Sequence, residues 1–264
     1  MKKGIILVSF GTSHNEARRL CIDSILNRIK EEYQDIPVLG AFTSQVIINI
    51  LKKRDKNQVF NIEEALMKMI EDGINIIYVQ PLFVLPGKEY SKLIDRLNNF
   101  NKENPDMKVR IGKPLLSDSL DYEKVVKGFV FLDIRDKEAL VLMGHGSDHK
   151  TDEAYEKLEN EFIRKTYNNV FIGTLKGKKT IDDIIVQLKA KGIRRVKLMP
   201  FMLLAGNHAK VDMVSGDDSW QGKLLLAGIM VEVLYIGLGQ IKEIQDIYMK
   251  HLDDILNIDN KNIT

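Results

Sequence analysis

Short runs of apolar residues alternate with longer amphipathic stretches along the whole chain. The short runs are rich in β-branched residues, as in Gly4–Phe10 (GIILVSF), which indicates strands buried on both faces. In the first half we expect strands at 4–10, 37–42, 74–83 and 109–111, with helices capped near 12–15 and running to about 32, and at 43–53, 62–72 and 88–100. Strands that alternate with helices predict parallel sheets covered by helices.

The same order repeats in the second half. We expect strands at 139–143, 170–172, 194–202 and 229–236, with helices at 151–165 and 181–191, from 207 onward and at 238–256. The two halves also share a sequence motif. PFMLLAGNH at 200–208 resembles PLFVLPGKE at 81–89, with a constant offset of 119 residues. We therefore predict two similar α/β halves, 1–125 and 126–264, with the closing helix 238–256 as a candidate to pack back on the first half.

The repeated motifs fall where strands end. In open parallel sheets, ligands bind beyond the carboxyl ends of the strands. The turn Phe10-Gly11-Thr12-Ser13 resembles His145-Gly146-Ser147, and Glu89 occupies the position equivalent to His208. We therefore expect a cleft between the two halves that collects residues near Phe10, Glu89, His145 and His208.

Composition narrows the classes of function. The chain has 264 residues, of which 44% are hydrophobic and 29% charged, and 39 Lys and Arg against 37 Asp and Glu give a net charge of +2. No global charge excess exists to favour nucleic acid or a membrane surface as a partner. A lone cysteine, Cys21, excludes an internal disulfide framework and any multi-cysteine metal site. The apolar runs are too short to span a bilayer and no signal-peptide cleavage pattern follows the first residues, so we expect a cytoplasmic protein.

Two of the five histidines are candidates for chemistry. His145 stands between two glycines at a strand end, and the repeat brings His208 to the corresponding edge of the same half. Neutral imidazole binds borderline metal ions and accepts protons near neutral pH. The alternative for His145 is a structural hydrogen bond to a neighbouring loop. His149 is either a supporting residue or exposed, His14 is expected at a helix entry, and His251 is expected on the surface.

Other positions suggest a proton carrier and a ligand surface. Glu89 lies in the first turn of its helix, where the dipole alone favours a carboxylate, but its equivalence to His208 makes it a candidate proton acceptor or relay. The turn from Phe10 to Ser13 can hold an anion with backbone N–H groups. Met202 and Leu203 belong either to the core or to an apolar platform for a flat ligand. No nucleotide-binding glycine pattern is present.

Several segments together resemble the anaerobic-type cobalt chelatases of cobalamin biosynthesis, the CbiK type of the class II chelatase superfamily. The matching segments are SFGTS at 9–13, PLFVLPGKEY at 81–90, MGHGS at 143–147, PFMLLAGNHA at 200–209 and VDMVSGDDSW at 211–220. The resemblance covers nearly the whole chain. It implies two flavodoxin-like halves and ATP-independent insertion of Co²⁺ into sirohydrochlorin, with no nucleotide. It also implies that His145 is base and metal ligand, that His208 is a metal ligand and that Glu89 belongs to the same site.

The chemistry of metal insertion agrees with these residue types. A tetrapyrrole loses two pyrrole protons as a divalent metal enters, and two histidines hold that metal less tightly than cysteines do. The carboxylates of sirohydrochlorin need donors, for which Lys88 and Lys176 are candidates. The substrate-binding candidates are Phe10, Gly11, Thr12, Ser13, Lys88, Met202 and Leu203.

Lys176 departs from the family pattern. The family commonly has a glutamate ligand in Gly-Thr-Val-Glu-Gly, whereas this chain reads GTLKG at 173–177. A lysine removes a hard ligand and adds positive charge. Alternatives therefore include a chelatase for Fe²⁺, Ni²⁺ or another porphyrin, and a tetrapyrrole- or haem-binding protein without turnover. A homo-oligomer is left open.

Overall fold

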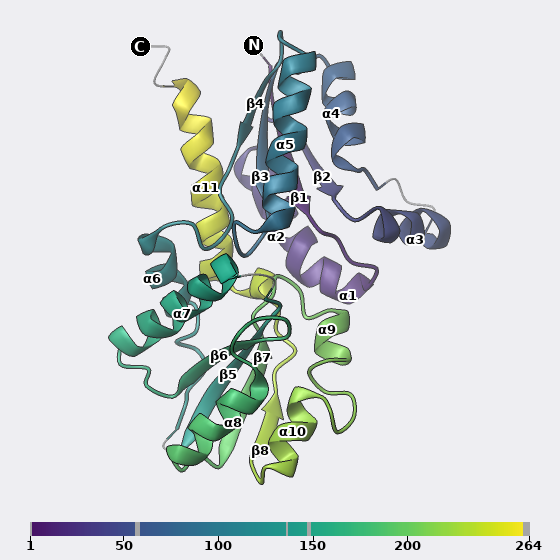
Figure 1. Ribbon diagram of the computed structural model, residues 1–264. Helices are drawn as coiled ribbons and strands as arrows, with labels where there is room; N and C mark the ends of the chain where they lie inside the picture. The colour runs from purple at the N-terminus through teal and green to yellow at the C-terminus, as the bar shows by residue number, and fades with distance from the viewer. Residues whose placement is uncertain (1, 56–58, 136, 147–148, 261–264) are drawn as a thin grey trace. The chain divides into compact units, whose positions relative to one another are not determined.

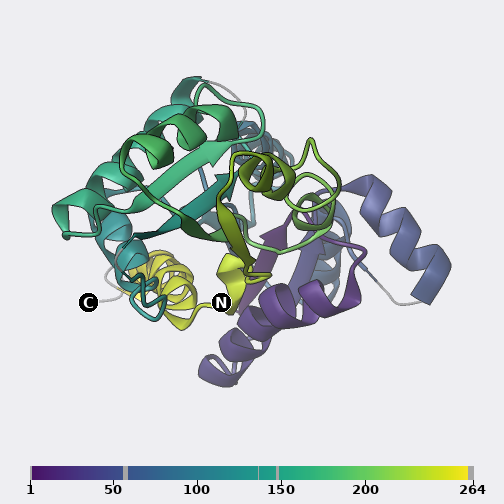
Figure 2. The same cartoon turned by 90° about the horizontal axis from the view of Figure 1, so that it is seen from below.

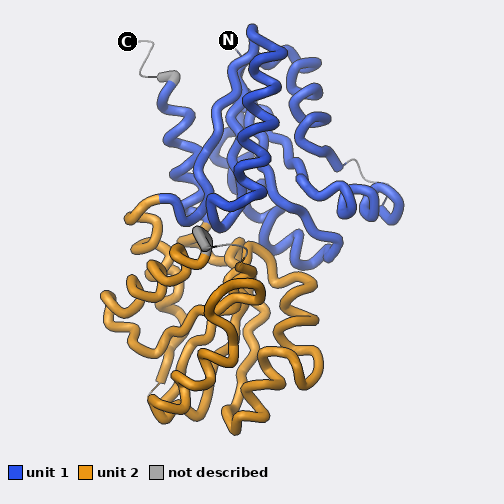
Figure 3. Tube along the Cα trace, in the orientation of Figure 1, with its two compact units in different colours: residues 1–117, 245–264 blue, residues 118–244 orange. Residues whose placement is uncertain are grey.

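The computed structural model describes residues 2–55, 59–135, 137–146 and 149–260 (Figure 1). The chain divides into two compact units: unit 1 comprises Met1–Ser117 and Gln245–Thr264, and unit 2 comprises Asp118–Ile244 (Figure 3). The division falls between Ser117 and Asp118, whereas the sequence analysis placed the boundary at 125/126. The sequence pattern predicts a connection between the halves near residues 118–136, but this segment begins with a helix, α6 (Ser119–Lys127). A capping box of Asp118 and Asp121 starts α6, which packs on α7 of unit 2.

Unit 1 contains a parallel sheet of four strands in the order β2-β1-β3-β4. Its strands are β1 (Lys3–Ser9), β2 (Val38–Phe42), β3 (Ile76–Pro81) and β4 (Lys108–Ile111). Its helices are α1 (Asn15–Ala17), the π-helical turn η1 (Arg18–Asp23), α2 (Ser24–Glu32), α3 (Gln45–Asp55), α4 (Ile62–Glu71), α5 (Lys88–Glu103) and most of α11 (Lys242–Asn260). The expected helix to residue 32 is therefore built from three consecutive turns or helices.

Alternate residues of the unit 1 sheet face two helical layers. Ile6, Val8 and Val79 pack with α4 and α5 in one hydrophobic cluster. Figure 2 shows α2 on the other face of the sheet from α5. Because both faces are covered, the central strand β1 is almost entirely apolar and buried, as its sequence predicts.

Helix α11 completes unit 1 although it is the last element of the chain. Tyr248 on this helix is fully buried and its hydroxyl donates a hydrogen bond of 3.2 Å to the carbonyl oxygen of Phe83. Tyr33 at the end of α2 donates a hydrogen bond to Asp253. His251, which we expected on the surface, is 3% exposed and its Nδ1 lies 3.2 Å from the carbonyl oxygen of Lys113. That expectation was wrong because His251 lies on the face of the helix that packs into the unit.

Unit 2 repeats the sheet, with strands in the order β6-β5-β7-β8, all parallel. Its strands are β5 (Glu138–Gly144), β6 (Val170–Thr174), β7 (Arg195–Pro200) and β8 (Met230–Val233). Its helices are α6, α7 (His149–Arg164), α8 (Ile181–Ala190), α9 (Asn207–Lys210), α10 (Trp220–Leu226) and the 3₁₀ turn η2 (Leu238–Gln240). Two four-stranded parallel sheets covered by helices confirm the predicted fold class.

The two faces of the second sheet are covered as in the first. Val141, Val196 and Leu198 pack with residues of α8, α9 and α10, including Trp220. On the other face, Phe129 lies against the rings of Phe162 and Phe201, and Tyr155 of α7 also contacts Phe201. Within the described residues, no helix combines the length and apolar character needed to cross a bilayer.

Candidate functional site

His145 is the first residue after β5, and the main chain around it is tightly held. The N–H of Leu175 donates to the carbonyl of Gly144 over 3.0 Å, and the N–H of Lys176 donates to the carbonyl of His145 over 3.1 Å. Gly146 has φ +68°, and a Cβ there would lie 2.9 Å from the backbone nitrogen of Gly177. The turn therefore requires glycine, and it presents the half-buried imidazole at the carboxyl end of the strand.

His208 is the second residue of α9, which follows β7 after the segment Phe201–Gly206. Its Nδ1 lies 2.6 Å from Oδ2 of Asp212, one helical turn further along the chain. The side chains of His208 and Asp212 are 43% and 40% exposed, so the pair faces solvent rather than the core.

The structure brings the two predicted histidines together within unit 2. Their ring centroids lie 5.1 Å apart with an interplanar angle of 74°. The Nδ1 atom of His145 lies 2.7 Å from the carbonyl oxygen of Gly146, which can only accept a hydrogen bond. The carboxylate of Asp212 likewise accepts from His208. Both Nδ1 atoms therefore carry hydrogen in the neutral rings, and both Nε2 atoms offer a lone pair.

This separation suits a shared metal ion. An ion about 2.1 Å from one nitrogen of each ring would lie about 3.2 Å from each centroid. Centroids 5.1 Å apart then subtend an angle of about 105° at the ion. That angle is close to tetrahedral, so the spacing of the rings is compatible with a two-nitrogen ligand set that leaves positions for water or for an incoming ligand.

The two predicted residues on α5 have different surroundings. Glu89 is in the first turn, and its Oε1 lies 2.8 Å from Nζ of Lys92, with the Glu89 side chain 43% exposed. Lys88, the first residue of the helix, is exposed. Glu89 is thus accessible to solvent and is held by an ion pair on its own helix.

The turn after β1 is ordered by its own hydrogen bonds. Phe10 is 51% exposed, and Gly11 has φ +90°, with the ring of Phe42 only 2.6 Å from where a Cβ would lie. The hydroxyl of Thr12 accepts from the N–H of His14 over 3.1 Å, so His14 stands at a helix entry as expected. The carbonyl of Ser13 accepts from Arg54 over 2.6 Å.

The remaining predicted residues, Met202, Leu203 and Lys176, belong to unit 2. Met202 is half-buried and Leu203 is 9% exposed, and their carbonyls accept from the N–H groups of Leu238 and Gly239. Lys176 is exposed. Ser147 and the side chain of His149 lie outside the described residues.

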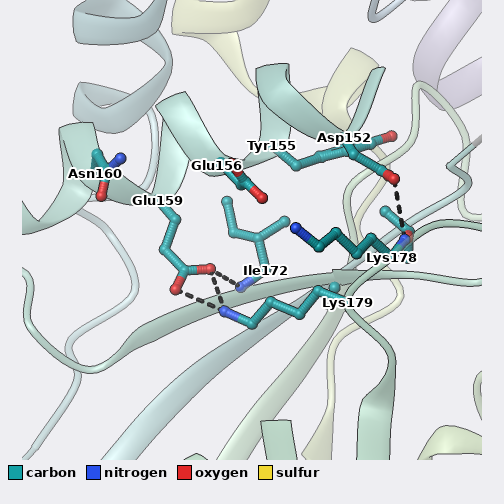
Figure 4. Close-up of a pocket in the computed structure, with 10 residues that line it drawn as sticks. Asp152, Tyr155, Glu156, Glu159, Asn160, Ile172, Lys178 and Lys179 are labelled. Carbon is teal, nitrogen blue, oxygen red and sulfur yellow. Dashed lines mark hydrogen bonds and ion pairs between the residues drawn. The ribbon is translucent and has the colours of Figure 1, made fainter. Parts of the chain in front are cut away.

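Two pockets occur in the described part of unit 2. One, of about 280 Å³, contains an ion pair in which Nζ of Lys179 lies 2.7 Å from both carboxylate oxygens of Glu159 (Figure 4). The other, of about 420 Å³, is lined by Asp212 and Thr174, among others. The hydroxyl oxygen of Thr174 is buried and has no hydrogen-bond partner among the described residues.

Sequence reasoning assigned no role to Asp212 or Tyr155. Asp212 stands four residues after His208, in the turn that follows α9, and that spacing is a signal that could have linked them. Tyr155 lies ten residues after His145, and burial raises its pKa to about 12, so its phenol is protonated at neutral pH. Nothing in the local pattern points to it.

Comparisons with known proteins agree with this architecture. The family model for cobalt chelatase (CbiK) matches residues 3–257. A relative from Salmonella typhimurium named sirohydrochlorin cobaltochelatase is 31% identical over 261 residues, covering 98% of this chain and 98% of its own. One from Nitratidesulfovibrio vulgaris, named sirohydrochlorin cobaltochelatase CbiKC, is 30% identical over 255 residues, covering 95% of this chain and 89% of its own.

Solved structures show the same fold at lower identity. SirB from Bacillus subtilis with Fe³⁺ has a TM-score of 0.71 at 18% identity, covering 97% of this chain and 96% of that one. A cobalt complex of the sirohydrochlorin chelatase SirB from Bacillus subtilis subspecies spizizenii has a TM-score of 0.68 at 17% identity, covering 97% and 95%. At this identity the likeness establishes the chelatase fold.

Proposed function

The chain belongs to the cobalt chelatase (CbiK) family, and from this premise we propose that it inserts Co²⁺ into sirohydrochlorin without using a nucleotide. The curated relatives carry the name of that activity over nearly the whole length of the chain. The metal ion is a substrate of this reaction. It must therefore be bound loosely enough to be released into the macrocycle.

The observation that carries the proposal is the pair of Nε2 atoms offered by His145 and His208. Each ring uses Nδ1 to donate to an oxygen, and the centroids are 5.1 Å apart. Two neutral nitrogens give an intermediate affinity for Co²⁺, Fe²⁺ and Ni²⁺, all of which imidazole can bind. We therefore assign both histidines as metal ligands, and the names of the curated relatives favour Co²⁺ as the metal substrate.

Insertion exchanges one metal ion for two protons. As the metal passes to the ring nitrogens, Nε2 of His145 is released and its lone pair can accept one pyrrole proton. We propose Glu89 as the acceptor or relay for the second proton. Glu89 would then have to break its ion pair with Lys92. That pair is accessible to solvent and consists of a single contact of 2.8 Å.

The tetrapyrrole is large, flat and rich in carboxylates, and the proposed binding residues match these properties. Lys88 and Lys176 would pair with carboxylates, and the turn at Phe10, Gly11, Thr12 and Ser13 would contribute an exposed aromatic ring and backbone donors. Met202 and Leu203 would supply apolar contact. Binding energy from these contacts would support ring distortion without a nucleotide.

The test is a spectrophotometric assay of sirohydrochlorin with Co²⁺ and purified protein, run without ATP and repeated with Fe²⁺ and Ni²⁺. We expect turnover with Co²⁺ and loss of turnover in His145→Ala with an unchanged circular dichroism spectrum, since a half-buried turn residue between two glycines contributes little packing. Binding of tetrapyrrole or haem without turnover would reject the enzyme in favour of a carrier. Normal turnover by folded His145→Ala would reject the assignment of the base.

His208→Ala separates the role of ligand from the role of base. Loss of one ligand should raise the Co²⁺ concentration needed for half-maximal rate, and excess Co²⁺ should restore part of the rate. An unchanged dependence on Co²⁺ would show that His208 is not a ligand.

A further inference from the structure

Tyr155 on α7 lies directly against the main chain that leads into His145. The side chain is 6% exposed. A Cβ on Gly144 would lie 2.7 Å from Cε1 and Cζ of Tyr155 and 2.8 Å from its hydroxyl oxygen. The phenol end therefore occupies the space that any other residue at position 144 would need. Its ring also meets Phe201 edge to face, with centroids 6.2 Å apart, so the side chain has little freedom to move.

The phenol oxygen is in contact with the turn itself. The backbone N–H groups of His145 and Gly146 lie close enough to lower the pKa of the phenol, against the larger opposite effect of burial. The same turn is also held by the N–H groups of Leu175 and Lys176, which donate to the carbonyls of Gly144 and His145 over 3.0 and 3.1 Å. Backbone bonds from the segment after β6 and a side chain of α7 thus both contact the turn.

We propose that Tyr155 is a positioning residue for His145: its buried phenol, lodged over Gly144, fixes the turn so that Nε2 of His145 points to the ion shared with His208. The inference rests on the proposed function, because the position of His145 affects metal transfer only if its Nε2 binds the metal ion or accepts a pyrrole proton. Nothing in the assignment of His145, His208 and Glu89 involves this residue.

The orientation of the His145 ring depends on contacts from outside the turn. His145 is flanked by two glycines, one of them at φ +68°, so its own backbone restricts the ring little once the external contacts are removed. The bond from Nδ1 to the carbonyl of Gly146 is internal to the turn and moves with it. The contact with Tyr155 ties the turn to a helix. Loss of a supporting group of this kind commonly costs about 10–100-fold in metal affinity or activity.

The test compares Tyr155→Phe with Tyr248→Phe, which also removes a buried hydroxyl bonded to the backbone but in unit 1. Co²⁺ binding is measured by calorimetry and by visible absorption of the bound ion, without tetrapyrrole, and kcat and both KM values are measured in the chelatase assay. For Tyr155→Phe we expect about 10-fold weaker Co²⁺ binding with a changed absorption band. We also expect a lower kcat and an unchanged KM for sirohydrochlorin. Tyr248→Phe should match the wild type in Co²⁺ affinity, absorption band, kcat and both KM values.

Wild-type Co²⁺ affinity, absorption band and kcat in Tyr155→Phe would overturn the proposal, as would an equal change in Tyr248→Phe. If Tyr155→Phe does not fold, hydrogen exchange of the His145 and Gly146 amides in the wild type decides. We expect both amides to be protected, and rapid exchange would overturn the proposal. Absence of chelatase activity would reject the proposed function. Co²⁺ binding and amide exchange need no turnover, so these two measurements would still test the role of Tyr155.

Discussion

Asp212→Asn tests the electrostatic part of the site with almost no change of shape. The carboxylate of Asp212 lies 2.6 Å from Nδ1 of His208 and does two things there. It fixes the hydrogen on Nδ1, and it places a negative charge on the far side of the ring from Nε2. The amide keeps an oxygen that can accept the same hydrogen bond, so the substitution mainly removes the charge.

The expected magnitude follows from the geometry. Adding the width of the imidazole and a metal–nitrogen bond of about 2.1 Å puts the carboxylate oxygen about 6–7 Å from a bound ion. A divalent ion and a unit charge at that distance attract by about 1 kcal/mol in water and more in a less polar environment. Because the two side chains are 43% and 40% exposed, the lower end applies. We therefore expect the Kd for Co²⁺ to rise about 5-fold.

Calorimetric titration of Co²⁺ into the protein at low ionic strength measures this effect, and Asp217→Asn is the matched control. Asp217 is exposed on the same connection and bears the same charge, but the structure gives it no bond to His208. Asp212 has no specific effect on the bound ion if Asp212→Asn binds Co²⁺ as the wild type does, or if Asp217→Asn weakens binding equally. The first result would count against His208 as a ligand of Co²⁺. The second would show that any nearby negative charge has the same effect on Co²⁺ binding.

Three further results are expected. Lys176→Glu should tighten Co²⁺ binding; unchanged affinity with a raised KM for sirohydrochlorin would instead point to contact with a substrate carboxylate, and no change in either would mean a solvent-facing side chain. Gly144→Ala should destabilise the protein by about 1–3 kcal/mol in urea unfolding and reduce turnover, since its Cβ meets the ring of Tyr155 at 2.7 Å; wild-type stability would contradict this. Burial raises the pKa of Tyr248, so the unfolded chain ionises there first as the pH rises above about 10, and stability falls. Tyr248→Phe should show a smaller loss between about pH 9 and 11, and an equal loss would refute that source.

The repeated architecture could be predicted because the strands are short, apolar and buried on both faces. The offset between the motifs at Pro81 and Pro200 is matched by the structure, where β3 and β7 each end on that proline next to the central strand of their sheet. The predicted family was also confirmed. His145 and His208 could be paired in advance because parallel strands end at a common edge.

Other features depend on contacts that no local pattern encodes. Helical spacing identified α11 as amphipathic but did not show that His251 lies on the buried side, beside Tyr248 and Leu252. Tyr155 was missed because its partner is the backbone of a turn in another element. The segment from residue 118 was expected to be a connection, although its capping box at Asp118 and Asp121 marks the start of α6.

The return of α11 to unit 1 has a consequence for how the protein is made. A ribosome delivers residues 1–117 long before 245–264, with the whole of unit 2 in between. Until α11 emerges, the surfaces that Tyr248 and Leu252 will cover remain uncovered, because both side chains are fully buried in the finished unit. Unit 2 is contiguous and can complete itself first, which reverses the usual order in which nascent domains mature. The first half of the chain is therefore the part most exposed to chaperones and proteases during synthesis.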